Sequence, residues 1–393
     1  MLLQGLKVVE MSTWIAAPGA AMIMAEWGAD VIKVESAEGD AIRRFYPDTE
    51  EIPGNPIFSM ENRGKRGVVL NVGEAAGRAA LIQLLKSADV FVTNLRSAAL
   101  ARLGLDYQTL ASRYPRLVYA AITGYGQTGP AAGKAGYDIG AYWSRSGMAL
   151  ALAPEGAEPP VSRPGQGDHP TGLAAAAGIA AALYSRERTG SGQLVSTSLL
   201  RSGAYAIGSD LISAAHHQPA VPIARRMMAN PLLAVYQSGD GEWFCLLGVQ
   251  PLRHLPGVAR AVGRPELADD PRFADLRSLI NHRHALLGLL DEAFAEHPMD
   301  YWARRFAAED VWWDPVQSAE QALADPLVQA AGVLRDVEDD ERKTIATPVD
   351  FSAMATSPAR RAPEAGEHTE QILLENGYDW ETIGELKTRG VIP

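Results

Sequence analysis

The chain has 393 residues, of which 47% are hydrophobic and 21% charged, a composition typical of a globular protein with two or three domains. Its formal net charge of -11 argues against nucleic acid as a partner, because a polyanion needs a basic surface. The single cysteine, Cys245, excludes a disulfide bond within the chain and a cysteine-based metal site.

The sequence also gives no sign of a membrane span or a bound metal. The longest apolar run, residues 173–184, is too short and too rich in alanine to cross a bilayer. The N-terminus lacks the charged region and cleavage site of a secretory signal. The eight histidines lack the His-Glu-x-x-His spacing of a zinc site. We therefore expect a cytoplasmic protein with no metal, no cofactor and no membrane partner.

The first 200 residues alternate between strand-like and helix-like segments. Strands are expected at 7–11, 29–35, 67–71, 89–95 and 116–123. Helices are expected at 19–26, 74–87, 98–114 and 173–184. Strands that read as continuous Val/Ile/Leu runs between helices indicate a parallel sheet covered on both faces. This pattern predicts an α/β fold with a Rossmann-like large domain.

The motifs of nucleotide-binding enzymes are nevertheless missing. The first helix opens with Ala-Ala-Pro-Gly at 16–19 instead of a Gly-x-Gly-x-x-Gly turn, and the chain has no phosphate-binding loop that ends in Gly-Lys-Ser/Thr. Their absence argues against an NAD-dependent dehydrogenase and against a nucleoside triphosphatase.

The pattern changes after about residue 200. A helix-like segment at 200–215 is followed by a Pro- and Arg-rich stretch, by a hairpin signal and by helical spacing at 258–306. The hairpin strands are expected at 233–236 and 243–247, and two later strands at 332–337 and 343–349. The pattern divides the chain into a large domain at 1–200, linker helices at 201–225, a small α+β domain at 226–325, and a segment at 326–393 that returns to the large domain.

Asp168 is the strongest candidate for a reactive side chain. It follows Gly167 and precedes the alanine-rich helix, so a carboxylate there meets the positive end of a helix dipole. Such a carboxylate can attack a carbonyl carbon. With an ordinary pKa of about 3.9, it would be ionised at neutral pH without further help. Taken alone, the same residue could also serve only as a helix cap.

Six blocks in order resemble the family III CoA-transferases, the formyl-CoA, carnitine and bile-acid CoA-transferase type. The blocks lie at 5–35, 62–66, 89–105, 123–130 with 136–138, 167–169 with 189–193, and 366–369. The resemblance implies an interlocked, ring-like homodimer whose Rossmann-like domain is built from both chain ends. It also implies that the protein moves CoA from an acyl-CoA thioester to a carboxylic acid.

In such an enzyme Asp168 aligns with the catalytic aspartate, which would form an aspartyl-acyl anhydride and then an aspartyl-CoA thioester. The resemblance places Arg102 near a phosphate of CoA, a substrate rather than a resident cofactor. The other residues implied to line the CoA pocket are Ile15, Ala16, Leu70, Asn71, Val72, Gly73, Asn94, Leu95, Arg96, Ala135, Gly136, Tyr137 and Asp138. The basic residues considered for the phosphates are Arg43, Arg44, Arg63, Lys65, Arg66, Arg96 and Arg102.

Two alternatives stay open at this point. A 2-methylacyl-CoA racemase or isomerase would use Asp168 as a base, but its partner histidine would fall where this chain has Tyr137, a poor base at neutral pH. Whether Tyr137 or His169 assists is not decided by the sequence. A CoA-binding protein without catalysis would use Asp168 only as a cap.

The acyl group is expected to be larger or more hydrophobic than formate or oxalate. Ile15 stands where the formyl-CoA branch has a glutamine, and no glycine-rich loop occurs between residues 226 and 255. Met227 and Met228 are candidates for the pocket or for the core. The segment 312–315 could form a pocket wall or a seam between domains.

Overall fold

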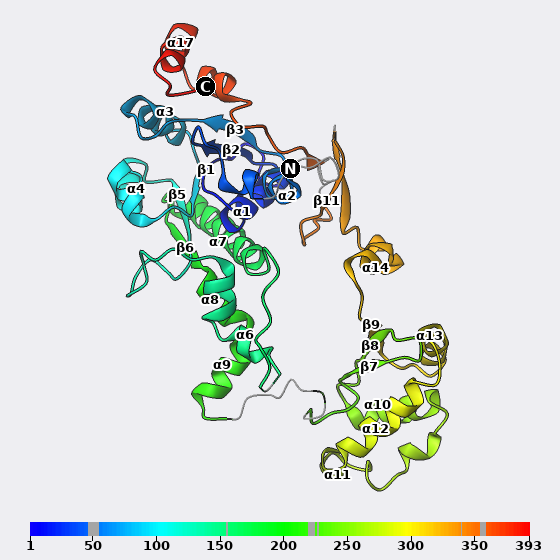
Figure 1. The fold of residues 1–393 in the computed structure, drawn as a ribbon. Coiled ribbons are helices and arrows are strands. Elements are labelled where there is room, and N and C mark those ends of the chain that lie inside the picture. The colour runs from blue at the N-terminus through cyan, green and yellow to red at the C-terminus, as the bar shows by residue number, and fades with distance from the viewer. Residues whose placement is uncertain (46–54, 155, 219–224, 226–227, 339, 354–358) are drawn as a thin grey trace. The chain divides into compact units, whose positions relative to one another are not determined.

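The computed structural model describes residues 1–393 except 46–54, 155, 219–224, 226–227, 339 and 354–358 (Figure 1). The chain divides into two compact units. The large unit comprises Met1–Leu150, Pro160–Gly208 and Gly332–Pro393, and the small unit comprises Ala151–Pro159 and Ser209–Ala331. Met227 and most of the Pro- and Arg-rich stretch lie outside the described residues.

A six-stranded, all-parallel sheet forms the centre of the large unit. The strand order is β3-β2-β1-β4-β5-β6. The strands are β1 (Lys7–Met11), β2 (Asp30–Glu35), β3 (Arg66–Val69), β4 (Val90–Thr93), β5 (Val118–Thr123) and β6 (Leu194–Ser198). This order is that of doubly wound nucleotide-binding sheets, in which the chain changes direction between β1 and β4. The predicted α/β class with a parallel sheet is confirmed.

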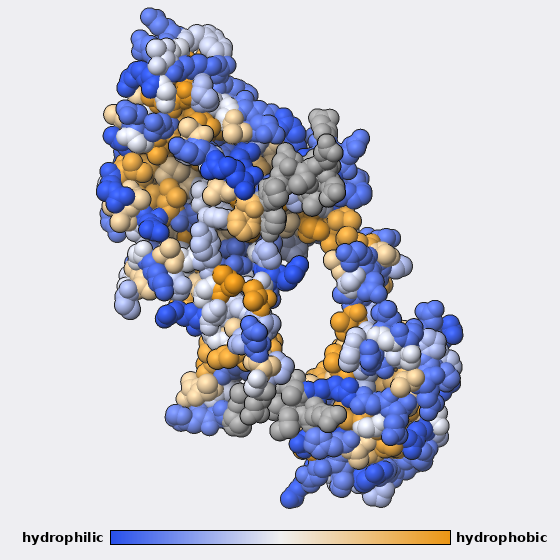
Figure 2. Space-filling view, viewed as in Figure 1, coloured by the Kyte–Doolittle hydropathy of each residue, from blue (hydrophilic) through white to orange (hydrophobic). Residues whose placement is uncertain are grey.

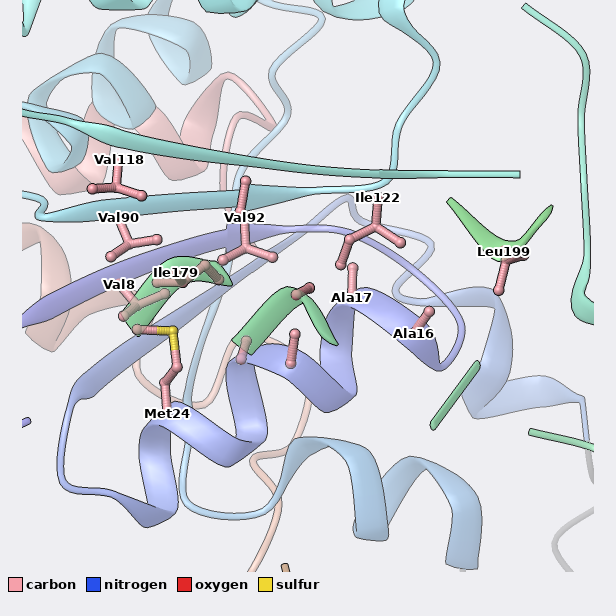
Figure 3. Close-up of a cluster of buried hydrophobic side chains, with 14 of the residues drawn as sticks. Val8, Ala16, Ala17, Met24, Val90, Val92, Val118, Ile122, Ile179 and Leu199 are labelled. Atoms are coloured by element: carbon pink, nitrogen blue, oxygen red, sulfur yellow. The ribbon is translucent and has the colours of Figure 1, made fainter. Parts of the chain in front are cut away.

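Helices cover both faces of this sheet because the strands are apolar on both sides. On one face Val8 and Val90 pack against α1 (Ala16–Glu26) and α7 (Asp168–Thr189), and Figure 3 shows strand valines of this cluster beside Met24 and Ile179. On the other face the strand residues pack against a second set of helices. These are α3 (Ala75–Leu85), α4 (Ser97–Leu103), α5 (Tyr107–Arg113), α16 (Thr369–Glu375) and α17 (Trp380–Thr388).

The pair α1 and α7 packs closely because small residues line its contact. A Cβ atom at Gly172 would lie 2.7 Å from the carbonyl oxygen of Ala16, so this position tolerates only glycine. The helix expected at 173–184 is longer in the structure, and α7 ends before Gly190, which adopts a left-handed conformation with φ of 75°. The close packing fixes the first turn of α7 beside the first turn of α1.

The remaining elements of the large unit are short. They are η1 (Ala41–Arg44), α2 (Pro56–Asn62), the π-helical turn η2 (Ile139–Ser144), α6 (Met148–Ala151), α8 (Leu199–Ala206), β10 (Leu334–Glu338), β11 (Asp340–Ile345) and β12 (Ala359–Arg360). Strands were expected at 332–337 and 343–349; β10 overlaps the first range, β11 begins before the second, and the two strands pair antiparallel.

The small unit has its own core around Phe244, Phe294 and Phe306. Its sheet joins β7 (Val235–Gln237), β8 (Trp243–Leu246) and β9 (Trp313–Pro315), and the predicted hairpin of β7 and β8 is confirmed. The segment 312–315 therefore supplies a strand of this sheet. The helices are α9 (Gly208–Ala215), α10 (Pro251–Ala261), η4 (Pro265–Ala268), α11 (Leu276–Asn281), α12 (Arg283–Phe294), α13 (Met299–Ala308), α14 (Ala319–Ala324) and α15 (Pro326–Ala330).

Candidate active site

A cavity of about 680 Å³ lies in the large unit at the carboxyl ends of β1, β4 and β5. This is the edge of a doubly wound sheet at which ligands bind, close to the change of direction between β1 and β4. The predicted site residues that line the cavity are Ile15, Ala16, Asn94, Leu95, Arg96, Ala135, Gly136, Tyr137, Asp138 and Asp168.

The other predicted pocket residues do not line this cavity. Leu70 and Val72 line a neighbouring hollow of about 160 Å³, which shares Thr13 and Leu95 with the main cavity. Asn71 and Gly73 bond to each other, since the Asn71 side-chain oxygen accepts from the Gly73 amide at 3.1 Å. Arg102 is exposed on the last turn of α4.

Asp168 is the first residue of α7 and does not cap it. Gly167 occupies the cap position, and no side-chain hydrogen bond caps this helix. The interpretation of Asp168 as a mere cap is therefore wrong. Glycine is required at 167 because a Cβ atom there would lie 2.5 Å from Cγ of Tyr142. The Gly167 amide donates to Asp138 Oδ2 at 3.3 Å, which fixes the turn in front of the helix.

The Asp168 carboxyl lies among other acids, and its electrostatics differ from the expectation for an isolated aspartate. Burial and the neighbouring charges of Asp138 and Glu61 raise the pKa of Asp168 to about 7, although His169 opposes them. At neutral pH the Asp168 carboxyl is therefore only partly ionised, unlike an aspartate with the ordinary pKa. Perturbed carboxyls of this kind are concentrated at catalytic sites.

His169 and Glu61 form a hydrogen-bonded pair next to Asp168 that does not line the cavity. Nε2 of His169 lies 2.8 Å from Oε1 of Glu61, a residue of α2 that is fully buried. Asp168 lines the cavity, whereas His169 contacts α2. Glu61 was not singled out from the sequence, because it lies 108 residues from His169.

One wall of the cavity is apolar and aromatic. Ile15 packs with the buried Ile42 and Phe58. Trp14 forms edge-to-face contacts with Phe45 and Tyr137, with ring centroids 5.5 and 5.2 Å apart. The predicted preference for a hydrophobic acyl group is consistent with this wall.

The loop that carries Trp14 is held from two sides. Trp14 has a positive φ of 71°, a strained conformation for a bulky residue, and its amide donates to Asp40 Oδ1 at 3.1 Å. Asn94 accepts from the Thr13 amide at 3.0 Å and donates to the Thr13 carbonyl at 2.6 Å. Asn94 thus ties the loop after β4 to the loop after β1.

Most of the basic residues that the sequence proposed for phosphates are engaged elsewhere. Four of them form ion pairs, and Arg44 donates to the Glu38 carbonyl. The pairs are Arg43–Glu35, Arg63–Glu26, Lys65–Glu10 and Arg66–Asp30. Within the described part of the chain, only Arg96 and Arg102 of that set have side chains without a hydrogen bond or ion pair.

Two further cations line the cavity and were missed. Lys134 lies 5.3 Å from the ring centroid of Tyr125, and Arg163 has no ion-pair partner among the described residues. Lys134 lies between the matched segments 123–130 and 136–138, directly before the predicted pocket residue Ala135, and this position was the available signal. Together with Arg96 they offer three cationic side chains at one cavity.

The described residues contain no group of three or more His, Cys, Asp or Glu side chains that could hold a metal ion. Among those same residues, no helix combines the length and apolar character needed to cross a bilayer.

The comparisons with known proteins identify the family of the chain. The model of CoA-transferase family III matches residues 3–369. The chain is 36% identical, over 100% of both chains, to the (R)-2-hydroxy-4-methylpentanoate CoA-transferase of Clostridioides difficile. It is 34% identical to the cinnamoyl-CoA:phenyllactate CoA-transferase of Clostridium sporogenes, over 98% of this chain and 95% of that protein.

A solved structure of a CaiB/BaiF family protein from Brucella suis has the same fold, with a TM-score of 0.83 and 30% identity over 95% of this chain and 99% of that one. The family match spans both the sheet edge that forms the cavity and the residue at the start of α7. The chain therefore belongs to CoA-transferase family III and is a CoA-transferase.

Proposed function

We propose that the protein transfers CoA from an acyl-CoA to a carboxylic acid with Asp168 as the covalent nucleophile. The observation that supports this most is the position of Asp168. Its carboxyl lines the large cavity at the start of α7, where the positive end of a 22-residue helix favours negative charge on a reacting oxygen.

The reaction takes four displacement steps. An Asp168 oxygen attacks the donor carbonyl carbon, the C–S bond breaks, and CoA leaves as a thiolate. The product of this step is an aspartyl-acyl anhydride. The thiolate then attacks the Asp168 carbonyl carbon and releases the donor carboxylate, which leaves an aspartyl-CoA thioester. The acceptor carboxylate attacks the carbonyl carbon of this thioester and expels the CoA thiolate, which gives a second anhydride between Asp168 and the acceptor. The thiolate finally attacks the acceptor acyl carbon of that anhydride and releases the Asp168 carboxylate. Asp168 is regenerated, and no proton, metal or oxidant is consumed.

Holding one carboxylate in the protein removes the entropic barrier of bringing two free reactants together. Three cations at the cavity, Arg96, Lys134 and Arg163, supply the positive charge that the phosphates of CoA require in a protein of net charge -11. The predicted contacts of 70–73 and Arg102 with CoA remain part of this proposal.

For the acceptor we propose carboxylic acids with a branched or aromatic side chain, including 2-hydroxy acids. Trp14, Ile15 and Ile42 give the cavity an apolar wall. Two relatives are named for 2-hydroxy-4-methylpentanoate and for phenyllactate, both 2-hydroxy acids with large apolar groups. Formate and oxalate would leave this wall without a contact.

The oligomer and its location are also proposals. The resemblance implies an interlocked homodimer, and the large unit exposes apolar side chains that a partner could cover. A lone thiol, Cys245, is compatible with the reducing cytoplasm.

The decisive experiment uses Asp168→Asn. We expect CoA transfer between acyl-CoA donors and a panel of carboxylic acids to fall by at least about 10³-fold, because the covalent route is lost. In the wild type, hydroxylamine added during turnover should give a hydroxamate at Asp168, located by mass spectrometry. A variant that retains wild-type turnover would mean that the nucleophile is elsewhere.

Two outcomes separate the alternatives. Exchange of the 2-proton of an acyl-CoA in deuterated water, without CoA transfer, would favour a racemase. Tight CoA binding without either activity would favour a binding protein.

A further inference from the structure

We infer that His169 and Glu61 act as a positioning pair that holds a positive charge beside the nucleophile Asp168. The inference rests on the proposed nucleophilic role of Asp168. Neither partner lines the cavity, so the pair would act on Asp168 without touching the substrate.

The contact itself indicates an ion pair. Nε2 of His169 lies 2.8 Å from Oε1 of Glu61, and the Glu61 side chain is only 1% exposed. The second carboxylate oxygen of Glu61 is buried and has no hydrogen-bond partner among the described residues. A buried carboxylate is strongly destabilised unless a counter-charge compensates it. The imidazole of His169 is the side chain that contacts it, so the protonated imidazolium is the favoured form.

Two glycines make room for this pair. A Cβ atom at Gly19 would lie 2.6 Å from Oε2 of Glu61, and a Cβ atom at Gly165 would lie 2.7 Å from Cε1 of His169. Gly165 also has a φ of 78°, which favours glycine. These close approaches hold the buried Glu61 carboxylate and one edge of the imidazole, while the rest of the His169 side chain, 44% of its surface, stays exposed.

The direction of the effect follows from the surrounding charges. The charged groups that act on Asp168 are Asp138, His169 and Glu61, and of the last two His169 acts more strongly. His169 is also the next residue in the chain, and Glu61 contacts Nε2, the ring nitrogen farther from the backbone, so the imidazole is the member of the pair nearer to the Asp168 backbone. The hydrogen bond that His169 donates to Glu61, together with the charges of Glu61, Asp168 and Asp138, outweighs burial and raises the pKa of His169 above its ordinary value. Lys65 is a further cation whose charge interacts with Glu61. The net effect of the pair is therefore to lower the pKa of Asp168.

Consecutive helix residues point about 100° apart, which explains how one turn of α7 serves both roles. Asp168 faces the cavity while His169 faces α2. Because the nucleophile must be ionised, a higher pKa of Asp168 reduces activity only on the acidic side of the pH profile.

The test is the pH dependence of kcat/KM for His169→Gln. We expect the acidic limb of the profile to shift to higher pH than in the wild type by about one unit, which is the usual effect of a nearby charge on a pKa. Activity at pH 6 would fall about tenfold, and activity at pH 9 would stay close to that of the wild type. His284→Gln, an exposed histidine on α12 of the small unit, is the matched control and should leave the profile unchanged.

A second variant guards against misfolding, because His169→Gln leaves Glu61 buried without its counter-charge. The double variant Glu61→Gln with His169→Gln removes both charges. Since His169 acts more strongly than Glu61, its acidic limb should lie between those of His169→Gln and the wild type.

The inference would be overturned if the acidic limbs of the pH profiles coincided in the wild type, His169→Gln and the double variant. It would also be overturned if His169→Gln lost the same fraction of activity at every pH. Both results leave the nucleophile itself untouched, since that role is decided separately by Asp168→Asn.

Discussion

Asp168 destabilises the fold at the pH at which it is reactive. Its folded-state pKa of about 7 lies above the ordinary value near 3.8, so the folded state binds the proton more tightly than the unfolded chain does. The stability that the protonated Asp168 carboxyl contributes is therefore fully present below about pH 4 and is lost as the pH rises through 7. A reactive carboxyl held among acids is stabilising only when it is protonated.

Because the ionised Asp168 destabilises the fold, we predict that Asp168→Asn is more stable than the wild type at pH 8. The difference is roughly 2 kcal/mol after allowance for the partial exposure of the side chain. The difference should shrink towards zero at pH 4, where the wild-type carboxyl is protonated. Urea unfolding at both pH values measures it, with the exposed Asp350→Asn as control. An advantage that is equal at both pH values would contradict the pKa of Asp168.

At this scale the sequence could predict residues that sit in short motifs after the strands. Tyr137 and Asp138 lie in the loop after β5, Asp168 opens α7 after a glycine, and the structure brings all three to one cavity. Glu61 could not be found in this way, because its partner is 108 residues distant and the contact exists only after α2 and α7 are packed. Trp14 was also missed as a wall residue, since its strained φ depends on Asp40.

Between neighbouring elements, a buried ion network ties β1, β2 and η1 together under the cavity loop. Glu10 and Lys33 are partners in the register of β1 and β2, and their charged atoms lie 3.0 Å apart. Lys33 also contacts Asp40 at 2.8 Å, and Lys65 contacts Glu10 at 2.6 Å. Burial raises the pKa of Glu10, but the two lysines outweigh it and lower that pKa to about 2. Glu10 therefore stays ionised at neutral pH.

We therefore predict that Lys33→Met destabilises the protein by about 3–5 kcal/mol, because it leaves Glu10 and Asp40 buried with too little positive charge. Chemical unfolding at pH 7 measures the loss. Lys86→Met, at an exposed position after α3, should change stability by no more than about 0.5 kcal/mol. Equal effects of the two substitutions would show that the network does not stabilise the fold.

The elements themselves were predictable where hydrophobic periodicity was strong. The first five strands follow Val/Ile-rich runs and appear where they were expected. Strand β6 was missed because its sequence, Leu-Val-Ser-Thr-Ser, is half polar, which suits the edge of a sheet. The helix expected at 98–114 is divided in two, because Gly104 adopts a φ of 68° and Asp106 caps α5. Local cap signals therefore outweighed the longer helical pattern.

For the whole molecule, the parallel sheet followed from the alternation of strands and helices along the chain. Its strand order could not be read from the sequence, because it depends on which crossovers pass on which face. The contribution of residues 332–393 to the large unit rests on contacts such as Ile372 and Leu373 with Val68 and Leu70. These contacts join residues about 300 apart and leave no periodic trace in the sequence.

The exposed apolar side chains of the large unit give the homodimer proposal a test. Tyr205 on α8 is 90% exposed, and Leu150 on α6 and Tyr184 on α7 are also exposed. Figure 2 shows hydrophobic residues at the surface over the region that Figure 1 labels α6 and α8. Large apolar groups on neighbouring helices are costly to leave in water and are typical of a surface that a second subunit covers.

We predict that the wild type elutes at twice the chain mass of 42.1 kDa in light scattering, and that Tyr205→Glu raises the dissociation constant of the dimer at least about tenfold by burying an unpaired charge. Trp380→Glu, which alters an exposed aromatic on α17, is the control and should leave the mass unchanged. Dilution from micromolar to nanomolar protein measures the constant. A monomeric wild type at micromolar concentration would contradict the dimer, because α8 would then face solvent in the active protein.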